Sequence, residues 1–263
     1  MAPSVLMCRP NYFGILYEIN PWMNKKNQPD KKMALEQWLK LTSALALVGV
    51  ELNFIEPQKG LPDMVFTANA GLIYRNQIVL SHFRHEERRG EIPHFKKWFE
   101  DHDYATRDFP RKRFFEGHGD ALWMGENLIC GHGLRSSEAG VKTAARMAEK
   151  DPVILKLINE HYYHLDTCFC PIPEKNLILY YPLAFDYASC RKIEALAQTI
   201  RVSERDARAF VCNAVSVGNK LVSTPMSKNL KKRLEKRGIE PVEVNLSEFL
   251  KSGGAAKCLT LFI

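Results

Sequence analysis

The sequence predicts an α/β fold made of five repeated units, each with the order strand, strand, helix, strand, that close into a ring. Three observations predict it: four short apolar runs that reverse at an asparagine, helical patterns between them, and two terminal apolar runs able to pair. The chain has 263 residues, 46% hydrophobic and 25% charged, which is ordinary globular composition. Without a linker or low-complexity segment, we expect one domain over residues 1–263.

The four apolar runs are predicted β-hairpins, because Asn and Gly tolerate the positive φ of tight turns. They cover residues 71–80, 121–130, 169–179 and 215–223. The turn asparagines are spaced 51, 49 and 43 residues apart, at Asn76, Asn127, Asn176 and Asn219. A regular period of this order is typical of a repeat architecture.

Helical patterns lie between or before the hairpins, and a short strand is expected after each. The expected helices cover residues 31–48, 92–101, 137–150, 191–201 and 227–237, and the following strands include residues 51–55, 161–165 and 242–244. The last run, residues 259–263, can pair with residues 5–9 to complete a fifth unit. Such closure would remove exposed strand edges. An open α/β sheet with coincidental spacing is the alternative.

Charge and cysteine content narrow the partners. The net charge is +7, with much of the excess in residues 228–237, which we interpret as the solvated face of a surface helix. Nucleic-acid binding is the alternative, but no aromatic residues interleave with these charges. No apolar run is long enough to span a membrane, and the N-terminal segment does not resemble a signal peptide. Seven cysteines, an odd count, favour reduced thiols in the cytoplasm.

Three segments supply a thiol, an imidazole and two carboxylates. Cys258 follows a loop of small residues, His164 and Asp166 lie mid-chain, and Glu116 lies upstream. This set suits attack on the cationic carbon of a guanidinium group. The thiol would be the nucleophile, His164 would act as acid and then base, and the carboxylates would hold the planar cation. Two residues apart on an expected strand, His164 and Asp166 would face the same side.

A metal site is the alternative for some of these residues. The candidate ligands are His161, His164, Cys168 and Cys170, and strand alternation would put both cysteines on the face of His164. However, a Cys-x-Cys spacing followed by Pro171 does not match a usual zinc pattern. No glycine-rich phosphate-binding motif is present either, so we expect neither a metal nor an organic cofactor.

Several motifs together resemble the guanidino-group-modifying enzymes of the pentein superfamily, which include amidinotransferases, arginine deiminases and dimethylargininases. They are residues 61–71, Glu116-Gly-His-Gly-Asp120, Gly133-Leu-Arg135-Ser136, His164-Leu-Asp166-Thr and the terminal Gly-Gly-x-x-x-Cys258. The resemblance implies a five-bladed α/β propeller with pseudo-fivefold symmetry and a central site. It implies Cys258 as nucleophile, His164 as acid/base, and Glu116 and Asp166 as guanidinium ligands. It also implies that Arg135 pairs with the substrate α-carboxylate and Asp63 with its ammonium group. The basic residue in this loop is often His or Arg in the family, whereas this chain has Lys257.

One further position bears on the reaction. Deiminases of this family tend to have Asp where this chain has Asn69. An amide lowers the negative charge of the site and both donates and accepts, so the site could take neutral citrulline for a second hydrolysis. With residues 17–23 and 83–90, this pattern resembles the amidinohydrolase domain of cyanobacterial arginine dihydrolases, which form ornithine, ammonia and carbon dioxide. That resemblance implies Asn20 and Arg88 as further substrate contacts.

The leading hypothesis is therefore a cofactor-free hydrolase of arginine or a close derivative, acting through a covalent cysteine intermediate. Arginine dihydrolase is favoured slightly over dimethylargininase, which yields citrulline and dimethylamine, and arginine deiminase is third. The alternative of another class is a non-catalytic pentein, such as the ribosome-binding translation initiation factor of this fold. The expected partner is a small guanidino amino acid, with neither nucleic acid nor membrane; oligomeric state stays open.

Overall fold

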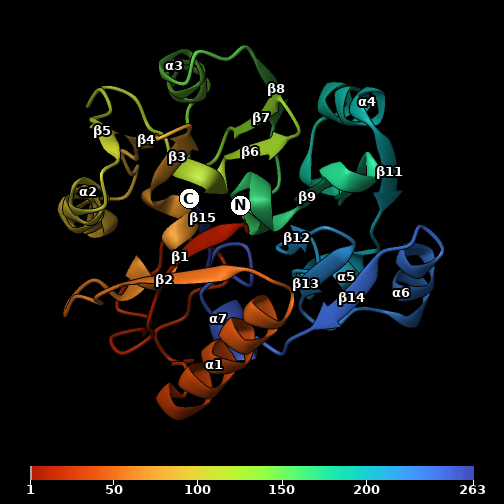
Figure 1. Cartoon of the computed structure of the whole chain (residues 1–263), viewed down its shortest axis with the longest axis horizontal. Helices are drawn as coiled ribbons and strands as arrows, with labels where there is room; N and C mark the ends of the chain where they lie inside the picture. Colours follow the sequence, from red (N-terminus) through yellow and green to blue (C-terminus); the bar gives the residue numbers. More distant parts are fainter. Residues whose placement is uncertain (1) are drawn as a thin grey trace.

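Five three-stranded sheets surround a central axis in the computed structural model, which describes residues 2–263 (Figure 1). In every sheet the middle strand runs antiparallel to the inner strand and parallel to the outer one. The larger helices lie on the outside of the ring (Figure 1). The fold is thus a five-bladed α/β propeller. The predicted class is confirmed, and the open-sheet alternative is wrong.

The strands follow one order in all blades, from the inner to the outer strand. The blades consist of β15 (Leu261–Phe262), β1 (Ser4–Cys8) and β2 (Glu51–Ile55); β3 (Gly71–Tyr74), β4 (Gln77–Leu80) and β5 (Ala105–Arg107); β6 (Ala121–Met124), β7 (Asn127–His132) and β8 (Pro152–Lys156); β9 (Phe169–Ile172), β10 (Leu177–Tyr180) and β11 (Gln198–Arg201); and β12 (Val215–Val217), β13 (Lys220–Ser223) and β14 (Glu240–Glu243). The helices are α1 (Lys31–Leu47), α2 (Ile92–Asp101), α3 (Glu138–Met147), α4 (Tyr187–Leu196), α5 (Glu204–Arg208), α6 (Lys228–Glu235) and α7 (Ser247–Leu250).

The ring closes through the two ends of the chain, as predicted. Strand β15 pairs antiparallel with β1, with Val5 opposite Phe262 and Leu6 opposite Leu261. Val5, Leu6 and Leu261 are fully buried. Because the last strand completes the first blade, the loop that carries Cys258 is drawn into the centre of the ring.

At three of the four hairpin turns, the residue with positive φ is not the expected asparagine. Positive φ occurs at Arg75, Gly125, Asn176 and Gly218. Only the turn before β10 therefore places its asparagine in the left-handed region, while in the others a neighbour takes that conformation. The spacing of the asparagines marked the blades correctly, but the tolerance of asparagine for positive φ accounts for one turn only.

Two expected elements are wrong. Residues 191–201 are not one helix: the Asp186 side chain accepts a hydrogen bond from Ser189 N–H and starts α4 earlier, and residues 198–201 form strand β11. Residues 161–165 are not a strand, because β8 is the third strand of that blade. Instead, His164 lies between two 3-10 turns, Glu160–Tyr162 and Leu165–Thr167.

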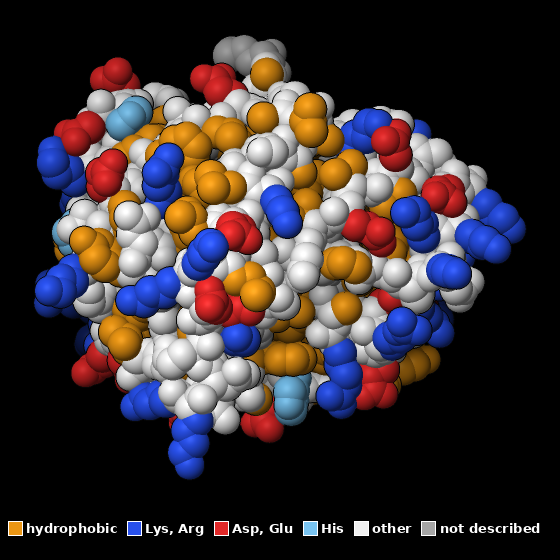
Figure 2. All heavy atoms as spheres, turned by 90° about the horizontal axis from the view of Figure 1, so that it is seen from below, with side chains coloured by type: hydrophobic (Ala, Val, Ile, Leu, Met, Phe, Trp, Pro, Cys, Tyr) orange, Lys and Arg blue, Asp and Glu red, His pale blue; other side chains and the backbone are white. Residues whose placement is uncertain are grey.

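The basic segment is a surface helix, as predicted. In α6, Leu230 and Leu234 are buried, and Lys231 pairs with Glu243 of β14. On the face in Figure 2, lysine and arginine side chains are interspersed with carboxylates and form no continuous basic patch. In the described part of the chain, no helix has the length and apolar character needed to cross a membrane.

Candidate active site

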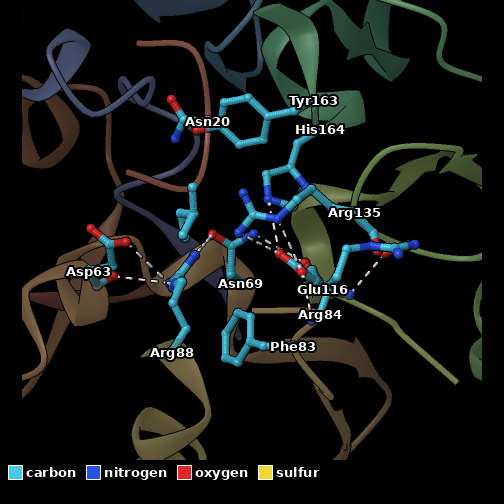
Figure 3. A network of polar contacts seen from close by, with 12 residues as sticks. Asn20, Asp63, Asn69, Phe83, Arg84, Arg88, Glu116, Arg135, Tyr163 and His164 are labelled. Carbon is cyan, nitrogen blue, oxygen red and sulfur yellow. Dashed lines mark hydrogen bonds and ion pairs between the residues drawn. The ribbon is translucent and has the colours of Figure 1, made fainter. Parts of the chain in front are cut away.

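A small cavity at the centre of the ring collects most of the predicted site residues. It has a volume of about 10 Å³ and is lined by Asn20, Asp63, Asn69, Arg88, Arg135, His164 and Cys258, together with Ile19, Met23, Phe66, Tyr163, Ser252 and Gly254. The other two predicted residues, Glu116 and Asp166, are fully buried beside it and contact His164 and Cys258. The structure therefore brings all nine together. Figure 3 shows the side chains of Arg135 and His164 converging on Glu116.

Asn213 organises the loop that presents the cysteine. Its Oδ1 accepts hydrogen bonds from Ala255 N–H at 2.9 Å and Cys258 N–H at 3.1 Å. Its Nδ2 donates to the Cys258 Sγ at 3.1 Å and to the Asp166 carbonyl at 3.0 Å. One fully buried amide thus fixes both the backbone and the sulfur of Cys258. Gly253, with φ of 76°, allows the chain to turn into this loop.

The thiol of Cys258 lies against a carboxylate. Its Sγ donates to Asp166 Oδ2 at 3.2 Å, and only 3% of the residue is exposed. Burial and the neighbouring Asp166 charge raise the pKa of Cys258 well above its usual value. Burial also raises the pKa of Asp166 to about 6, although His164 and Lys257 oppose that shift. The pair therefore carries a proton until a cation arrives to compensate the charge.

Two carboxylates hold the imidazole of His164. Its Nδ1 lies 3.0 Å from Asp120 Oδ2, and its Nε2 lies 3.3 Å from Glu116 Oε2. Burial lowers the pKa of His164, but the Asp120 charge and hydrogen bond outweigh burial and raise that pKa to about 9. Asp120 is itself fixed by Ser136 Oγ at 2.6 Å and Leu165 N–H at 3.1 Å. His164 is thus held in one orientation, with Nδ1 toward Asp120, Nε2 toward Glu116 and a proton to donate.

Glu116 is paired with an arginine. Arg135 Nη2 lies 3.0 Å from Glu116 Oε2, and Arg135 Nε donates to Oε1 at 3.2 Å. Burial would raise the pKa of Glu116, but Arg135 and His164 hold it well below its usual range. The Arg135 guanidinium also lies 5.2 Å from the centre of the Tyr163 ring. Glu116 is therefore an anion, and its partner Arg135 lines the cavity.

At the other end of the cavity, Arg88 fixes both Asn69 and Asp63. It is buried and paired with Glu91 at 2.8 Å, and its Nη1 donates to Asn69 Oδ1 at 2.8 Å. Asn69 Nδ2 then donates to the Glu116 carbonyl at 3.1 Å. Because an arginine only donates and a carbonyl only accepts, both neighbours require this orientation of the amide. The Asp63 carbonyl also accepts from Arg88, at 3.1 Å.

Glycine is needed where Asn69 approaches the Glu116 segment. A Cβ at Gly119 would lie 2.3 Å from Asn69 Nδ2 and 3.2 Å from His164 Nδ1. Any side chain there would push the amide and the imidazole apart. The position directly after His118 therefore requires glycine.

Buried polar atoms without a well-aligned hydrogen bond gather at this site. Among the described residues, eight buried side-chain atoms have none, and five of them belong to residues of the cavity and its walls: Asp63 Oδ1, Glu116 Oε2, His164 Nε2, Asp166 Oδ1 and Ser252 Oγ. Unsatisfied buried polar groups are rare because each costs about 1–3 kcal/mol. Three of the five are carboxylate oxygens, so the arrangement is suited to a ligand rich in N–H donors.

Two candidate ligands of the metal alternative lie away from the site. Cys168 and Cys170 do not approach the cavity: the Cys168 thiol donates to the carbonyls of His164 and Leu165, and both cysteines pack in the hydrophobic core. Within residues 2–263, no three His, Cys, Asp or Glu side chains are close enough together to hold a metal. Asn20 lines the cavity and is held by two hydrogen bonds: its Oδ1 accepts from Trp22 N–H, and its Nδ2 donates to the carbonyl of Ser252 in the distant C-terminal loop.

Four residues of the site received no role from the sequence. Asp120 holds His164, Asn213 holds Cys258, Glu91 holds Arg88, and Tyr17 donates to Asp63 Oδ2 at 3.0 Å. The repeated units of the sequence contain a signal for Asp120 and Asn213. Asp120 directly precedes the inner strand β6, and Asn213 lies two residues before β12, just as Asn69 lies two residues before β3.

The fold and this thiol, imidazole and carboxylate arrangement define the class of pentein proteins that modify guanidino groups. The chain matches the family described as N,N dimethylarginine dimethylhydrolase, eukaryotic, over residues 9–263. It belongs to that family.

Relatives with two different described activities are similar to this chain. The chain is 44% identical to the bifunctional arginine dihydrolase/ornithine cyclodeaminase ArgZ of Synechocystis sp. over 98% of this chain, but spans only 37% of that relative's length. It is 37% identical to the N(G),N(G)-dimethylarginine dimethylaminohydrolase of Mycobacterium tuberculosis, covering 98% of this chain and 84% of that one. A crystal structure of the N-terminal domain of ArgZ bound to substrate has a TM-score of 0.95 and 43% identity, covering 99% of this chain and 97% of that chain.

Proposed function

We propose that this chain hydrolyses arginine through a covalent intermediate on Cys258 and releases ornithine, ammonia and carbon dioxide. The observation that carries the proposal is the set of unsatisfied carboxylate oxygens in and behind one cavity that also holds a thiol. We also propose that residues 1–263 act as one catalytic domain, in a reducing compartment such as the cytoplasm, because the nucleophile must stay a free thiol.

Arginine has N–H donors on its guanidinium and on its α-ammonium group, and it has an anionic α-carboxylate. The site offers a partner for each of these three groups. Asp166 Oδ1, which has no hydrogen-bond partner, and Glu116 Oε2, whose present partner is Arg135, accept the N–H groups of the guanidinium. Asp63 Oδ1, also unsatisfied, accepts from the α-ammonium group. Arg135 turns from Glu116 toward the α-carboxylate as the guanidinium takes its place on Glu116. Asn20 shapes this end of the cavity, and Arg88 acts by orienting Asn69 and Asp63.

The first hydrolysis begins when the bound cation lowers the pKa of Cys258. The thiolate forms a bond to the guanidinium carbon, and His164 gives its proton to the departing amine, which leaves as ammonia. A thiouronium remains on Cys258. His164, now neutral, takes a proton from water, whose oxygen attacks the same carbon. The C–S bond breaks and restores the thiolate, the product loses one proton to solvent, and neutral citrulline is formed.

A second round removes the remaining ammonia. The thiolate attacks the ureido carbon of citrulline, His164 again protonates the leaving amine, and a thiocarbamate forms on Cys258. Water then releases the carbamate of ornithine, which loses carbon dioxide. Asn69 favours this round, because its amide adds no negative charge and only one of its two N–H groups is used, by the Glu116 carbonyl. The free N–H is available to the ureido oxygen.

Dimethylargininase activity is the second candidate, supported by the family match and by the Mycobacterium tuberculosis relative. Support for the dihydrolase comes from the cyanobacterial relatives. One structure of the ArgZ N-terminal domain is described as covalently bound to a reaction intermediate, with a TM-score of 0.95 to this chain. In both reactions the same thiol attacks the same carbon, so the two differ in the leaving amine and in whether citrulline is hydrolysed in a second round.

Product analysis separates the candidates. Purified protein is incubated separately with arginine, dimethylarginine, citrulline and agmatine, and products are identified by mass spectrometry. We expect ornithine from arginine and from citrulline. Citrulline as the only product of arginine would indicate a deiminase. Dimethylamine from dimethylarginine, with arginine left unchanged, would establish the dimethylargininase and overturn the proposal.

A further inference from the structure

A second cavity begins one residue away from the nucleophile. It has a volume of about 230 Å³, and Lys257 lines it while the next residue, Cys258, lines the active-site cavity. The two cavities share no lining residue among those that the structure describes. The walls of the second cavity are mainly apolar and aromatic, with Leu122, Trp123, Phe169, Val215 and Phe262 among them.

A buried ammonium group belongs to this apolar cavity. Lys257 is only 8% exposed, and among the described residues its Nζ has one hydrogen bond, to the Thr260 carbonyl at 3.3 Å. The Nζ also lies 5.8 Å from the centre of the Phe262 ring. An ammonium has three donors, so Lys257 with this one hydrogen bond is under-satisfied. Burial lowers the pKa of Lys257 although the Asp166 charge opposes that shift, so an anion in the cavity would stabilise the ammonium form.

Two further polar groups of this cavity, on His118 and Ser216, can act as donors. His118 lines the cavity, and its Nε2 accepts from Ile73 N–H at 3.3 Å, so the neutral ring carries its proton on Nδ1. Burial and the Lys257 charge lower the pKa of His118, which keeps the ring neutral. Ser216 also lines the cavity, and its buried hydroxyl has no hydrogen-bond partner in the described part of the chain.

We propose that this cavity binds a small monocarboxylate with an apolar, preferably aromatic, body. The carboxylate would pair with Lys257 and accept from His118 and Ser216, while the body would contact Trp123 and Phe169. The combination of one cation, two neutral donors and apolar walls is complementary to that chemistry. Glu174, an exposed carboxylate that also lines the cavity, disfavours ligands with a second negative charge.

The probe is phenylacetate, and its matched control is the neutral isostere phenylacetamide. Binding to the whole chain is measured by isothermal titration calorimetry under reducing conditions. The active site also holds an arginine suited to carboxylates, so two variants separate the cavities: Lys257→Met and Arg135→Met. Each removes one cation and keeps an apolar stem.

We expect phenylacetate to bind with one-site stoichiometry and phenylacetamide to bind at least about tenfold more weakly. Lys257→Met should weaken phenylacetate binding by at least about tenfold, whereas Arg135→Met should leave it unchanged. If Lys257→Met does not fold by circular dichroism, Ser216→Leu, which narrows the same cavity at a partly exposed position, should give the same loss. Equal binding of the amide, no binding at millimolar phenylacetate, or loss in Arg135→Met alone would overturn the proposal.

Discussion

Asn69 is predicted to decide whether hydrolysis stops at citrulline, and Asn69→Asp tests this. Arg88 Nη1 donates to Asn69 Oδ1 at 2.8 Å, and this contact survives the substitution. The other amide atom, Nδ2, donates to the Glu116 carbonyl at 3.1 Å. Aspartate would put a second oxygen in that place, so two acceptors would face each other. Losing this buried hydrogen bond costs about 1–3 kcal/mol.

The new charge also changes which substrate the site favours. Glu116 is already an anion, and a further carboxylate near it favours cationic arginine over neutral citrulline. A lost contact of about 1.4–2.7 kcal/mol to the ureido group corresponds to a roughly 10- to 100-fold slower second round. The first round should change much less.

The assay follows arginine, citrulline and ornithine over time by mass spectrometry. We expect Asn69→Asp to accumulate citrulline and the unmutated protein to release ornithine. The matched control is Asn69→Ala, which removes the amide without adding charge. If Asn69→Asp releases ornithine as fast as the unmutated protein, the reasoning about charge and the amide N–H is refuted.

Five other outcomes are expected. Asn213→Ala should lower kcat by roughly 10- to 100-fold, because the Cys258 loop and sulfur lose the amide that holds them. An unchanged kcat in steady-state assays would show that Asn213 does not position Cys258. Agmatine lacks the carboxylate that we assign to Arg135, so its kcat/KM should be lower than that of arginine by about 100-fold or more. Equal values would show that Arg135 does not bind the substrate carboxylate. The kcat/KM should fall as pH decreases through about 6, where Asp166 becomes protonated, and as pH rises through about 9, where His164 loses its proton. In Lys257→Met the acid limb should move to higher pH, because the Lys257 charge lowers the pKa of Asp166; an unmoved limb would assign it to another group. Dialysis against a chelator should leave turnover intact, and loss restored by zinc would contradict the cofactor-free chemistry.

The blades could be predicted because each repeats a local signal. A hairpin of apolar residues with a turn residue between them is specified within about ten residues, and its recurrence gives the ring. The pairing of residues 259–263 with 5–9 followed from the need to close the edge. The start of α4 was missed because Asp186, its N-cap, lies before the apolar pattern that predicted the helix.

The local conformation of the site was less predictable. The alternation argument for His164 and Asp166 assumed a strand, whereas the structure has 3-10 turns there. These residues nevertheless reach the centre, because every such segment precedes an inner strand. Asp166 lies three residues before β9, Cys258 lies three residues before β15, and Asn213 lies two residues before β12. That regularity, applied to all five units, identifies Asn213 from sequence alone.

Partners within the site depend on long-range packing and could not be predicted. The Arg88–Glu91 pair is local, but the contact of Arg88 with Asn69 joins different segments of the chain. The same holds for Tyr17 and Asp63, which are 46 residues apart. Hydrogen bonds of this kind depend on the final placement of backbones, and no periodicity in the sequence encodes them.

The most direct test of the central claim is the reaction of arginine with the unmutated chain and with Cys258→Ala, with ornithine, citrulline and ammonia quantified together. Covalent catalysis by Cys258 predicts ornithine with about twice as much ammonia from the unmutated chain. It predicts a rate at least about a thousandfold lower from Cys258→Ala, because no other group can replace the thiol. Near-normal turnover by Cys258→Ala, or arginine left unchanged by the unmutated chain, would contradict the account.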